Sequence, residues 1–265
     1  GELMTKRVDV VREADTVAFA HQVMLWRSVG HLPIVDAKDQ VVGILSDRDL
    51  LRFVVEGPAG ALPVREIMTT PVESVAPETS IIEASARLVA SRIDALVVIE
   101  GGRLRGILTS SDILAERGRL AHKGGQGKLP CASDVMHRRV LTCEPTDTLD
   151  SAIHKLMDAE VRHLPVVDGD YRVVGILSDR DVRTAIGDPR EAVRREDDGF
   201  LSDILVENVM TPDPMVVPAT ASVLQVADVL LDERVGALPV VSDDDKLLGI
   251  ISYVDMIGYF VGRRG

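Results

Sequence analysis

The sequence has few cysteines and few aromatic residues. Cys131 and Cys143 are the only cysteines in 265 residues, which excludes a disulfide framework and favours a reducing compartment. Aromatic residues make up 3% of the chain, so we expect a core packed from Val, Ile, Leu and Ala side chains. The sequence also lacks an apolar run long enough to span a membrane and an N-terminal signal-peptide pattern, and we therefore expect a cytoplasmic protein.

Positive charge is in deficit as well. The chain has 30 Lys and Arg residues against 42 Asp and Glu residues, which gives a formal net charge of −12 at pH 7. This balance argues against sequence-independent binding to nucleic acid, although it leaves room for a local basic pocket. We therefore predict neither a nucleic-acid partner nor a membrane partner.

Motifs that would indicate catalysis or a bound metal are missing too. The six histidines have no metal-ligand spacing with Cys, Asp or Glu. The glycine-rich stretch 124–128 lacks the spacing of a phosphate-binding loop, and Leu129 stands where that loop needs Ser or Thr. No nucleophile has an evident base. The sequence therefore predicts no enzyme, no catalytic cofactor and no metal ligand.

The main feature of the chain is a repeat. Residues 31–50 read HLPIVDAKDQVVGILSDRDL, and residues 163–182 read HLPVVDGDYRVVGILSDRDV. Looser copies occupy residues 95–114 and 237–256. A unit of about 60–70 residues is marginal for burying a core alone, so we expect the four repeats to fold as pairs.

Each repeat predicts the order strand, helix, strand, strand, helix. In repeat 1 we expect a strand over 8–11, a helix after Asp15 or Thr16, strands over 32–35 and 41–45, and a second helix from 46–49. Repeat 3 has the clearest helical stripe, formed by Leu149, Ala152, Ile153, Leu156 and Met157. The sequence therefore predicts an α/β (α+β) fold.

The repeats and their connections divide the chain into six segments. The repeats are predicted at residues 1–57, 61–118, 131–187 and 204–265. A glycine-rich linker at 119–130 would separate the two halves of the chain. A charged connection at 188–203 would join repeats 3 and 4.

A Ser/Thr-x-x-Asp motif follows the last strand of each repeat. The four pairs are Ser46 and Asp49, Thr109 and Asp112, Ser178 and Asp181, and Ser252 and Asp255. One interpretation is a helix capping box. The other is a ligand site, because a helix N-terminus attracts an anion and a carboxylate can accept hydrogen bonds from two sugar hydroxyls. Both interpretations can hold in different repeats.

Basic residues alternate between odd and even repeats. Repeats 1 and 3 carry a His before Leu-Pro, an Arg before the motif Asp, and a basic pair after the first Met of the repeat. These residues are His31, His163, Arg48, Arg180, Lys6-Arg7 and Arg138-Arg139. Converging cations beside a helix N-terminus suit a phosphate. The alternative is scattered surface charge, with both histidines packed against a strand; the joint alternation favours phosphate.

Taken together, these motifs resemble the CBS domain, named after cystathionine beta-synthase. The resemblance rests on the Met-Thr start, the strand around Leu-Pro, and the Gly-Ile-Leu-Ser-x-x-Asp ending, with small variations between repeats. In that family two repeats pack through their sheets as a Bateman module. Two modules often form a flat disc, as in the regulatory subunit of AMP-activated protein kinase. The resemblance implies two modules here, forming a one-chain disc or half of a larger homodimer.

The resemblance also implies a ligand and the residues that bind it. CBS pairs typically bind adenine nucleotides or related adenosyl ligands in clefts between repeats. The motif Asp holds the ribose, which suits Asp49, Asp112, Asp181 and Asp255. The motif Ser or Thr contacts phosphate or ribose, which suits Ser46, Thr109, Ser178 and Ser252. Basic residues hold phosphates, which suits His31, His163, Arg48 and Arg180. The residues that follow the Met-Thr start of a repeat form part of the base pocket, which suits Thr70, Val72 and Arg138.

We therefore predict a non-catalytic sensor that binds AMP, ADP or ATP, with or without Mg²⁺, and signals to a protein partner. The alternatives are an interaction scaffold with empty clefts and a module for S-adenosylmethionine. The sequence departs from the family pattern at Val97, which replaces the strand proline of repeat 2, and in repeat 4, which lacks the basic residues. We therefore expect the sites with odd-repeat basic residues to dominate.

Overall fold

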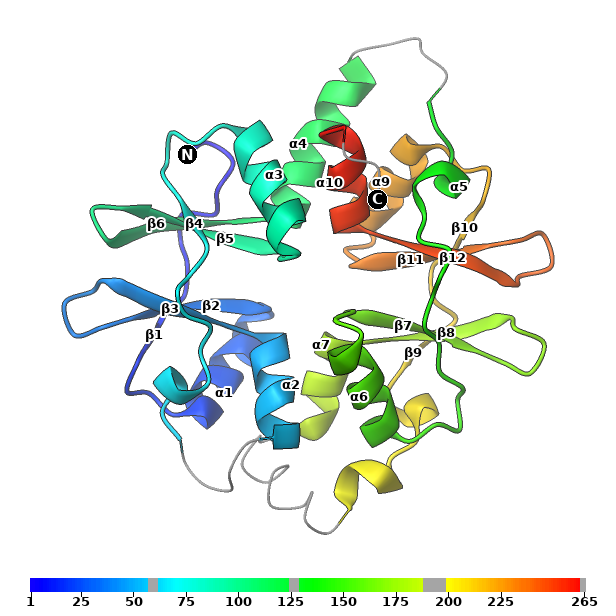
Figure 1. Cartoon of the computed structure of the whole chain (residues 1–265), viewed down its shortest axis with the longest axis horizontal. Helices are drawn as coiled ribbons and strands as arrows, with labels where there is room; N and C mark the ends of the chain where they lie inside the picture. The colour runs from blue at the N-terminus through cyan, green and yellow to red at the C-terminus, as the bar shows by residue number, and fades with distance from the viewer. Residues whose placement is uncertain (57–61, 124–128, 188–198, 263–265) are drawn as a thin grey trace.

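The computed structural model describes residues 1–56, 62–123, 129–187 and 199–262. Within these ranges there are four three-stranded sheets, one for each repeat, and the sheet of repeat 3 takes its third strand from the start of repeat 4. The helices lie on the outer face of each sheet, and the sheets of repeats 1 and 2 face each other, as do those of repeats 3 and 4 (Figure 1). The paired repeats predicted from the sequence are thus present in the fold.

The elements follow in chain order. Repeat 1 contains β1 (Val11–Arg12), α1 (Val17–Arg27), β2 (His31–Val35), β3 (Val41–Ser46) and α2 (Asp47–Glu56). Repeat 2 contains η1 (Val64–Glu66), β4 (Ser74–Val75), α3 (Ile81–Ser91), β5 (Ala95–Glu100), β6 (Arg103–Thr109) and α4 (Ser110–Lys123). Repeat 3 contains α5 (Ala132–Val135), α6 (Leu149–Asp158), β7 (His163–Val167), β8 (Val173–Ser178) and α7 (Asp179–Ile186). Repeat 4 contains η2 (Phe200–Asp203), η3 (Val206–Asn208), β9 (Thr211–Pro212), β10 (Val217–Pro218), α9 (Val223–Asp232), β11 (Ala237–Val241), β12 (Leu247–Ser252) and α10 (Tyr253–Phe260).

The first strand of each repeat is shorter than the sequence predicts. A strand over 8–11 was expected in repeat 1, but β1 has only two residues, which pair in parallel with Ile34 and Val35. In repeat 3 the equivalent contact is a single parallel bridge from Cys143 to Val166. The alternating apolar pattern therefore continues beyond the short stretch that pairs with the central strand.

The helical stripe predicted in repeat 3 is confirmed. Leu149, Ala152, Ile153 and Leu156 of α6 are each at most 2% exposed. Ser or Thr caps the helix before the central strand of every repeat by accepting a hydrogen bond from the backbone N–H three residues later, as the motif chemistry predicts. The capping residues are Thr16, Ser80, Thr148 and Ser222.

The start of each repeat crosses over to the partner repeat. Thr69 pairs with Ile44 of β3 in repeat 1. The same antiparallel contact joins Thr5 to Ile107, His137 to Ile250, and Thr211 to Ile176. Repeats 1 and 2 are therefore interlocked by two exchanged segments, and so are repeats 3 and 4.

The recurring Met and Gly residues stabilise this exchange. A Cβ atom on Gly43 of β3 would overlap the Met68 side chain at the start of repeat 2. The other three pairs are Gly106 with Met4, Gly175 with Met210, and Gly249 with Met136. Because glycine has no side chain, the methionine can lie flat on the partner's strand. The methionines are therefore packing residues.

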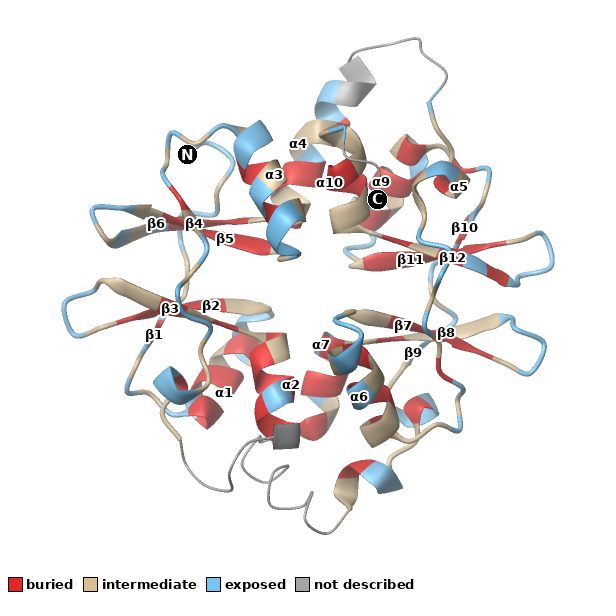
Figure 2. Ribbon diagram, in the orientation of Figure 1, coloured by how far each residue is buried: buried red, intermediate tan, exposed pale blue. Residues whose placement is uncertain are grey.

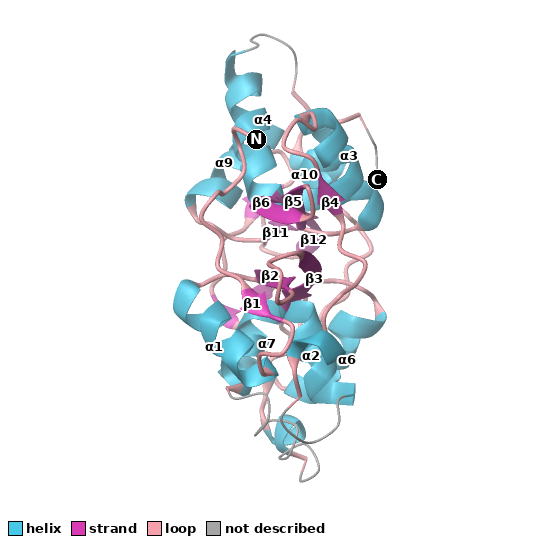
Figure 3. Ribbon diagram, turned by 90° about the vertical axis from the view of Figure 1, so that its left-hand side faces the viewer, coloured by secondary structure: helices cyan, strands magenta, loops and turns pink. Residues whose placement is uncertain are grey.

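The two modules meet through helices at both ends of a flattened disc (Figures 1 and 3). Helix α2 of repeat 1 packs against α7 of repeat 3. Helix α4 of repeat 2 packs against α9 and α10 of repeat 4. Buried residues concentrate on the strands and on the helix faces between the modules (Figure 2).

The apolar core runs through these contacts. Leu51 and Val54 of α2 join the core cluster of repeat 3. Leu114 of α4 joins that of repeat 4, and Ile257 of α10 joins that of repeat 2. Each module therefore completes its hydrophobic core with side chains from the other module.

Both predicted connections fall partly outside the described residues. Helix α4 extends to Lys123 and so covers the first part of the predicted linker 119–130, while residues 124–128 lie outside the described ranges. In the predicted connection 188–203, residues 188–198 lie outside the described ranges, and η2 begins at Phe200.

Candidate functional site

The four Ser/Thr-x-x-Asp motifs have the same local geometry. In repeat 1, one carboxylate oxygen of Asp49, Oδ2, accepts hydrogen bonds from the Ser46 backbone N–H at 2.7 Å and hydroxyl at 2.7 Å. Asp112, Asp181 and Asp255 make the same two bonds to their own Ser or Thr, at distances between 2.6 and 2.8 Å. The capping interpretation thus accounts for one oxygen of each Asp and leaves Oδ1 for another partner.

Two of these Oδ1 atoms face the exchanged start of the partner repeat. The Thr69 hydroxyl donates to Oδ1 of Asp49 at 2.9 Å. In the other module, Nε2 of His137 lies 2.7 Å from Oδ1 of Asp255. Each candidate cleft is therefore formed by the motif Asp of one repeat and the start segment of its partner.

The residues predicted for the base pocket lie in these start segments. Thr70 follows Thr69 and is exposed, and Val72 is partly buried before β4. Arg138 follows His137 and is exposed, and its guanidinium donates to the Ser133 carbonyl at 3.0 Å. The chain thus places these residues next to, or close after, the start-segment residues Thr69 and His137 that contact Asp49 and Asp255.

His31 and His163 begin the central strands of their repeats. Strand pairing places His31 opposite Ser46 and His163 opposite Ser178. A Cβ atom on Gly236 would lie 2.6 Å from Nε2 of His163, so this imidazole contacts the equivalent strand start in repeat 4. Both histidines therefore lie beside the motif Ser, at strand starts that Figure 1 places toward the centre of the disc.

Burial keeps these two imidazoles neutral. It lowers the pKa of His31 to about 4, and the positive charge of Arg162 lowers it further. Burial is also the main reason that the pKa of His163 is lowered to about 4. At neutral pH both side chains can offer a hydrogen bond but not a positive charge to a ligand.

The two arginines of the basic pattern differ in their surroundings. Arg48 donates to the carbonyl groups at the end of α6, at 3.3 Å for Leu156, 3.1 Å for Met157 and 3.5 Å for Val161. It thus bridges the two modules. Arg180 is exposed at the start of α7. In addition to burial, the positive charge of Arg180 lowers the pKa of both His31 and His163, so Arg180 lies near the histidines, while Arg48 is engaged in the module interface.

Two charged residues that were not predicted from the sequence lie beside the histidines. Arg162 and Asp94 form an ion pair of 2.8 Å between repeats 3 and 2. Each precedes the central strand of its repeat, at the position where repeats 1 and 4 have Gly30 and Gly236. A charge directly before a buried strand was the signal that would have identified them.

A second ion pair joins repeats 1 and 3. Arg183, 3% exposed at its side chain, lies 2.6 Å from Asp47, and it also donates to the Val29 carbonyl at 2.7 Å. Burial raises the pKa of Asp47, while Arg183 opposes the rise. Burial also raises the pKa of Asp179 to about 6. The interface between repeats 1 and 3 therefore holds buried carboxyl groups whose ionised forms are disfavoured by burial.

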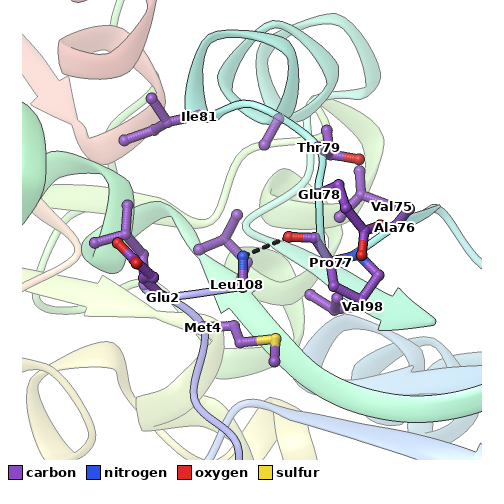
Figure 4. Close-up of a pocket in the computed structure, with 13 residues that line it drawn as sticks. Glu2, Met4, Val75, Ala76, Pro77, Glu78, Thr79, Ile81, Val98 and Leu108 are labelled. Atoms are coloured by element: carbon purple, nitrogen blue, oxygen red, sulfur yellow. Dashed lines mark hydrogen bonds between the residues drawn. The ribbon is translucent and has the colours of Figure 1, made fainter. Parts of the chain in front are cut away.

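Two surface hollows lie away from the motif residues. A hollow of about 260 Å³ lies at the start of α3, where the amino group of Gly1 donates to the Pro77 carbonyl at 2.5 Å (Figure 4). Another of about 420 Å³ lies beside Phe19 and Trp26 of α1. No predicted ligand-binding residue lines either hollow, so the motif clefts remain the candidate site.

The N-terminal hollow corresponds to a position that is covered in the other repeats. In repeat 1 the Val17 N–H donates to the Leu62 carbonyl, and the Val64 N–H donates to the Asp15 carbonyl. Segments 204–207 and 130–133 make the same contacts in repeats 3 and 4. The hollow at α3 is therefore a packing feature of the repeat and is separate from the motif clefts.

Among the described residues, no three His, Cys, Asp or Glu side chains are grouped so that they could hold a metal ion. Every helix in the same ranges is too short or too polar to cross a lipid bilayer.

Comparison with known proteins gives a consistent family match. The family model of the CBS domain matches residues 1–56, 64–118, 132–188 and 206–262. Protein MJ1225 of Methanocaldococcus jannaschii is 25% identical over 188 residues, which cover 68% of this chain and 67% of MJ1225. Its crystal structure, described as a proposed archaeal homologue of g-AMPK, matches with a TM-score of 0.86 at 22% identity and covers 98% of each chain. The likeness to MJ1225 extends over the whole disc fold.

Other relatives match over parts of the chain. YhcV of Bacillus subtilis is 33% identical over 115 residues, which cover 43% of this chain and 79% of YhcV. Inosine-5'-monophosphate dehydrogenase of M. jannaschii is 31% identical over 126 residues, which cover 48% of this chain and 23% of the dehydrogenase. The match to this enzyme is thus confined to a minor part of its length.

Proposed function

The chain belongs to the CBS domain family, and we propose that it is a regulatory protein that binds an adenine nucleotide in the clefts between paired repeats. The observation that carries this proposal is the position of the motif carboxylates. One oxygen is fixed by the helix cap, and Oδ1 of Asp49 faces the partner repeat's start segment, where Thr69 donates to it at 2.9 Å. A ribose hydroxyl can take the place of that donor.

The centre of the disc supports the placement of the phosphates. His31 and His163 lie beside the motif serines, and Arg162 lies close enough to influence the pKa of both imidazoles. Because Arg162 retains its charge at any physiological pH, it is the better electrostatic partner for a phosphate than the two neutral histidines. We place the nucleoside at the start segments and the phosphates toward this centre.

The interlocked repeats give binding a route to a regulatory output. A ligand in a motif cleft contacts both repeats of a module, because the carboxylate and the start segment belong to different repeats. Its binding would favour one relative position of the two repeats over others. A protein partner that recognises the disc surface would then respond to the nucleotide concentration.

Relatives define the ligands to be tested. CBSX2 of Arabidopsis thaliana, which is 28% identical over 129 residues, has been crystallised with AMP. The CBS pair of MJ0100 has been crystallised with 5'-methylthioadenosine and S-adenosylmethionine. The panel for this protein is AMP, ADP, ATP and S-adenosylmethionine, each with and without Mg²⁺.

Isothermal titration calorimetry of the ligand-free protein tests the proposal. Micromolar binding of an adenine nucleotide is the expected result, and its stoichiometry counts the working clefts. Sedimentation of the same samples would report whether a homodimer forms. If folded protein binds none of the four ligands, the scaffold interpretation replaces the nucleotide sensor, and a protein partner becomes the object of the search.

Paired substitutions test which clefts dominate. Replacing both Asp49 and Asp181 by Ala should weaken nucleotide binding about tenfold or more, the size expected from the loss of charge-assisted hydrogen bonds. Replacing Asp112 and Asp255 should have a smaller effect if the odd-repeat motifs dominate. The corresponding Asn variants keep an oxygen for the helix cap and so separate ligand binding from helix stability. Equal losses in the two pairs would contradict the predicted dominance of the odd repeats.

A further inference from the structure

One start segment differs chemically from the other three. The residue after the first Met is Thr5, Thr69 and Thr211 in repeats 1, 2 and 4, but it is His137 in repeat 3. All four residues pair with an Ile in the last strand of the partner repeat. They are therefore equivalent in register, and the substitution of an imidazole for a hydroxyl is local to one cleft.

The carboxylate of Asp255 is fully engaged in that cleft. Its Oδ2 accepts the backbone N–H of Ser252 at 2.7 Å and the Ser252 hydroxyl at 2.6 Å. Its Oδ1 lies 2.7 Å from Nε2 of His137. The imidazole thus occupies the one carboxylate oxygen that the helix cap leaves for a ligand.

His137 is nevertheless free to leave. Its side chain is 60% exposed, whereas that of Asp255 is 12% exposed. An exposed imidazole can rotate into solvent with little loss of packing, while the carboxylate is held by its cap. The contact therefore has one fixed partner and one movable partner.

We propose that His137 gates the Asp255 cleft, so that a ribose hydroxyl must displace the imidazole from Oδ1 before the nucleotide can bind. This inference rests on the proposed nucleotide-binding function and adds a regulatory property to one of its clefts. The hydroxyl donates to the carboxylate in place of Nε2, and no covalent bond changes.

The gate makes binding at this cleft depend on pH. The hydrogen bond and the negative charge of Asp255 raise the pKa of His137, while partial burial and the positive charge of Arg92 oppose the rise. Displacement removes the carboxylate's effect, so the pKa of His137 falls toward its ordinary value and a proton is released. Between these two pKa values, affinity at the Asp255 cleft therefore increases with pH.

The Asp49 cleft is a matched control. Its Oδ1 accepts a hydrogen bond from the uncharged Thr69 hydroxyl, whose displacement involves no proton release near neutral pH. His137→Thr should convert the gated cleft to the chemistry of the Asp49 cleft. Thr69→His should introduce an imidazole beside Asp49 and give that cleft a dependence on pH.

Histidine NMR of the whole protein tests the gate at the residue itself. The chain has six histidines, and the resonance lost in His137→Thr identifies His137. We expect saturating AMP to lower the pKa of His137. The AMP-induced change in its chemical shift should be largest near and just above pH 6.5, the ordinary imidazole pKa. Calorimetry in two buffers with different ionisation enthalpies should show the matching proton release, which His137→Thr should abolish.

Affinity measurements provide an independent outcome. His137→Thr should strengthen AMP binding at the Asp255 cleft by about fivefold at pH 6, the size expected for an exposed ion pair, and much less at pH 8.5. AMP binding that leaves the His137 resonance unchanged would overturn the gate and leave the proposed function intact. Stronger wild-type binding at acid pH would also overturn it, because His137 would then attract the phosphate. Absence of any nucleotide binding would overturn the proposed function and the gate together.

Discussion

The two ends of the disc join the modules by different chemistry. Where repeat 1 meets repeat 3, the buried side chains of Asp47 and Arg183 form an ion pair of 2.6 Å. Where repeat 2 meets repeat 4, Leu114 and Ile257 enter the opposite module's core, and both are 0% exposed. The same repeat fold thus forms one interface that adds a buried ion pair to the apolar contacts of Leu51 and Val54, and another that depends mainly on apolar area.

This difference indicates which interface between the modules can respond to pH and to bound anions. Apolar burial is almost independent of pH and of anions, whereas a buried ion pair changes with both. The polar end also contains Arg48, which bridges to the last carbonyls of α6. We infer that apolar burial holds the modules together at both ends and that the end with the buried ion pair is the one sensitive to pH.

The largest expected effect comes from breaking the buried ion pair. Arg183→Leu should lower the free energy of unfolding by about 3–5 kcal/mol at pH 8, because Asp47 is left buried without its cation. Leucine is the residue that repeat 1 carries at the equivalent position, Leu51. The loss should be smaller at pH 5, where the carboxyl can take up a proton. Urea unfolding at the two pH values measures both effects.

The double variant Asp47→Asn with Arg183→Leu is the control for this prediction. Removing both charges should recover much of the lost stability, because the cost arises from the unpaired carboxylate. If the double variant is as unstable as Arg183→Leu, lost packing of the arginine would explain the effect and the electrostatic account of this interface would be wrong.

A slightly smaller effect is expected at the apolar end. Leu114→Ala should cost about 3 kcal/mol, because a fully buried leucine leaves a cavity in the core of repeat 4. The loss should be the same at pH 5 and pH 8. Leu120→Ala in the same helix is the matched control, since Leu120 is 44% exposed, and it should change stability by less than about 0.5 kcal/mol. A clear pH dependence of the Leu114 effect would contradict the contrast between the two ends.

The third prediction sharpens the contrast through pH. Burial raises the pKa of Asp179 to about 6 from a model-peptide value of 3.8. The folded protein therefore binds a proton that the unfolded chain has lost, and this group's contribution to stability falls as pH rises from about 4 to about 6. The difference amounts to about 2–3 kcal/mol. Asp179→Asn should remove this slope.

Urea unfolding between pH 4 and pH 7 measures the slope as the difference between wild type and variant. Taking the difference matters because His31 and His163 titrate with the opposite sign: their lowered pKa values stabilise the fold as pH rises from about 4 to about 6.5. Asp158→Asn, at an exposed position in the same repeat, controls for the loss of one charge. A difference that stays constant across the range would show that Asp179 does not titrate with folding.

Much of the fold could be predicted because the repeats carry redundant signals. The hydroxyl caps and the stripe of α6 each encode a local contact, and the caps recur in all four repeats. The helix-capping role of each Ser/Thr-x-x-Asp motif could be predicted for the same reason. By contrast, the partner of Asp255 is His137 from another repeat, and strand exchange of this kind leaves no local pattern in the sequence.

The hydrogen-bond partners of Arg48 could not be predicted for a related reason. Its alternation with His31 indicated a common site, but α2 lies at a module interface, and its carbonyl partners are about a hundred residues away in the chain. A long flexible cation binds the nearest unsatisfied carbonyl groups, which here belong to the end of α6. Whether a basic residue serves a ligand or an interface is therefore decided by tertiary packing.

The smallest expected effect distinguishes these two arginines. Arg48→Met should lower the free energy of unfolding by about 1 kcal/mol, because it removes hydrogen bonds to the end of α6 but keeps the aliphatic stem. Arg180→Met, at the equivalent exposed position of repeat 3, should change stability by less than about 0.5 kcal/mol. Thermal and urea unfolding of both variants would measure the contrast. If nucleotide binding falls in Arg48→Met while stability does not, Arg48 serves the ligand, as its alternation with His31 predicted, and the polar interface depends on Asp47 and Arg183 alone.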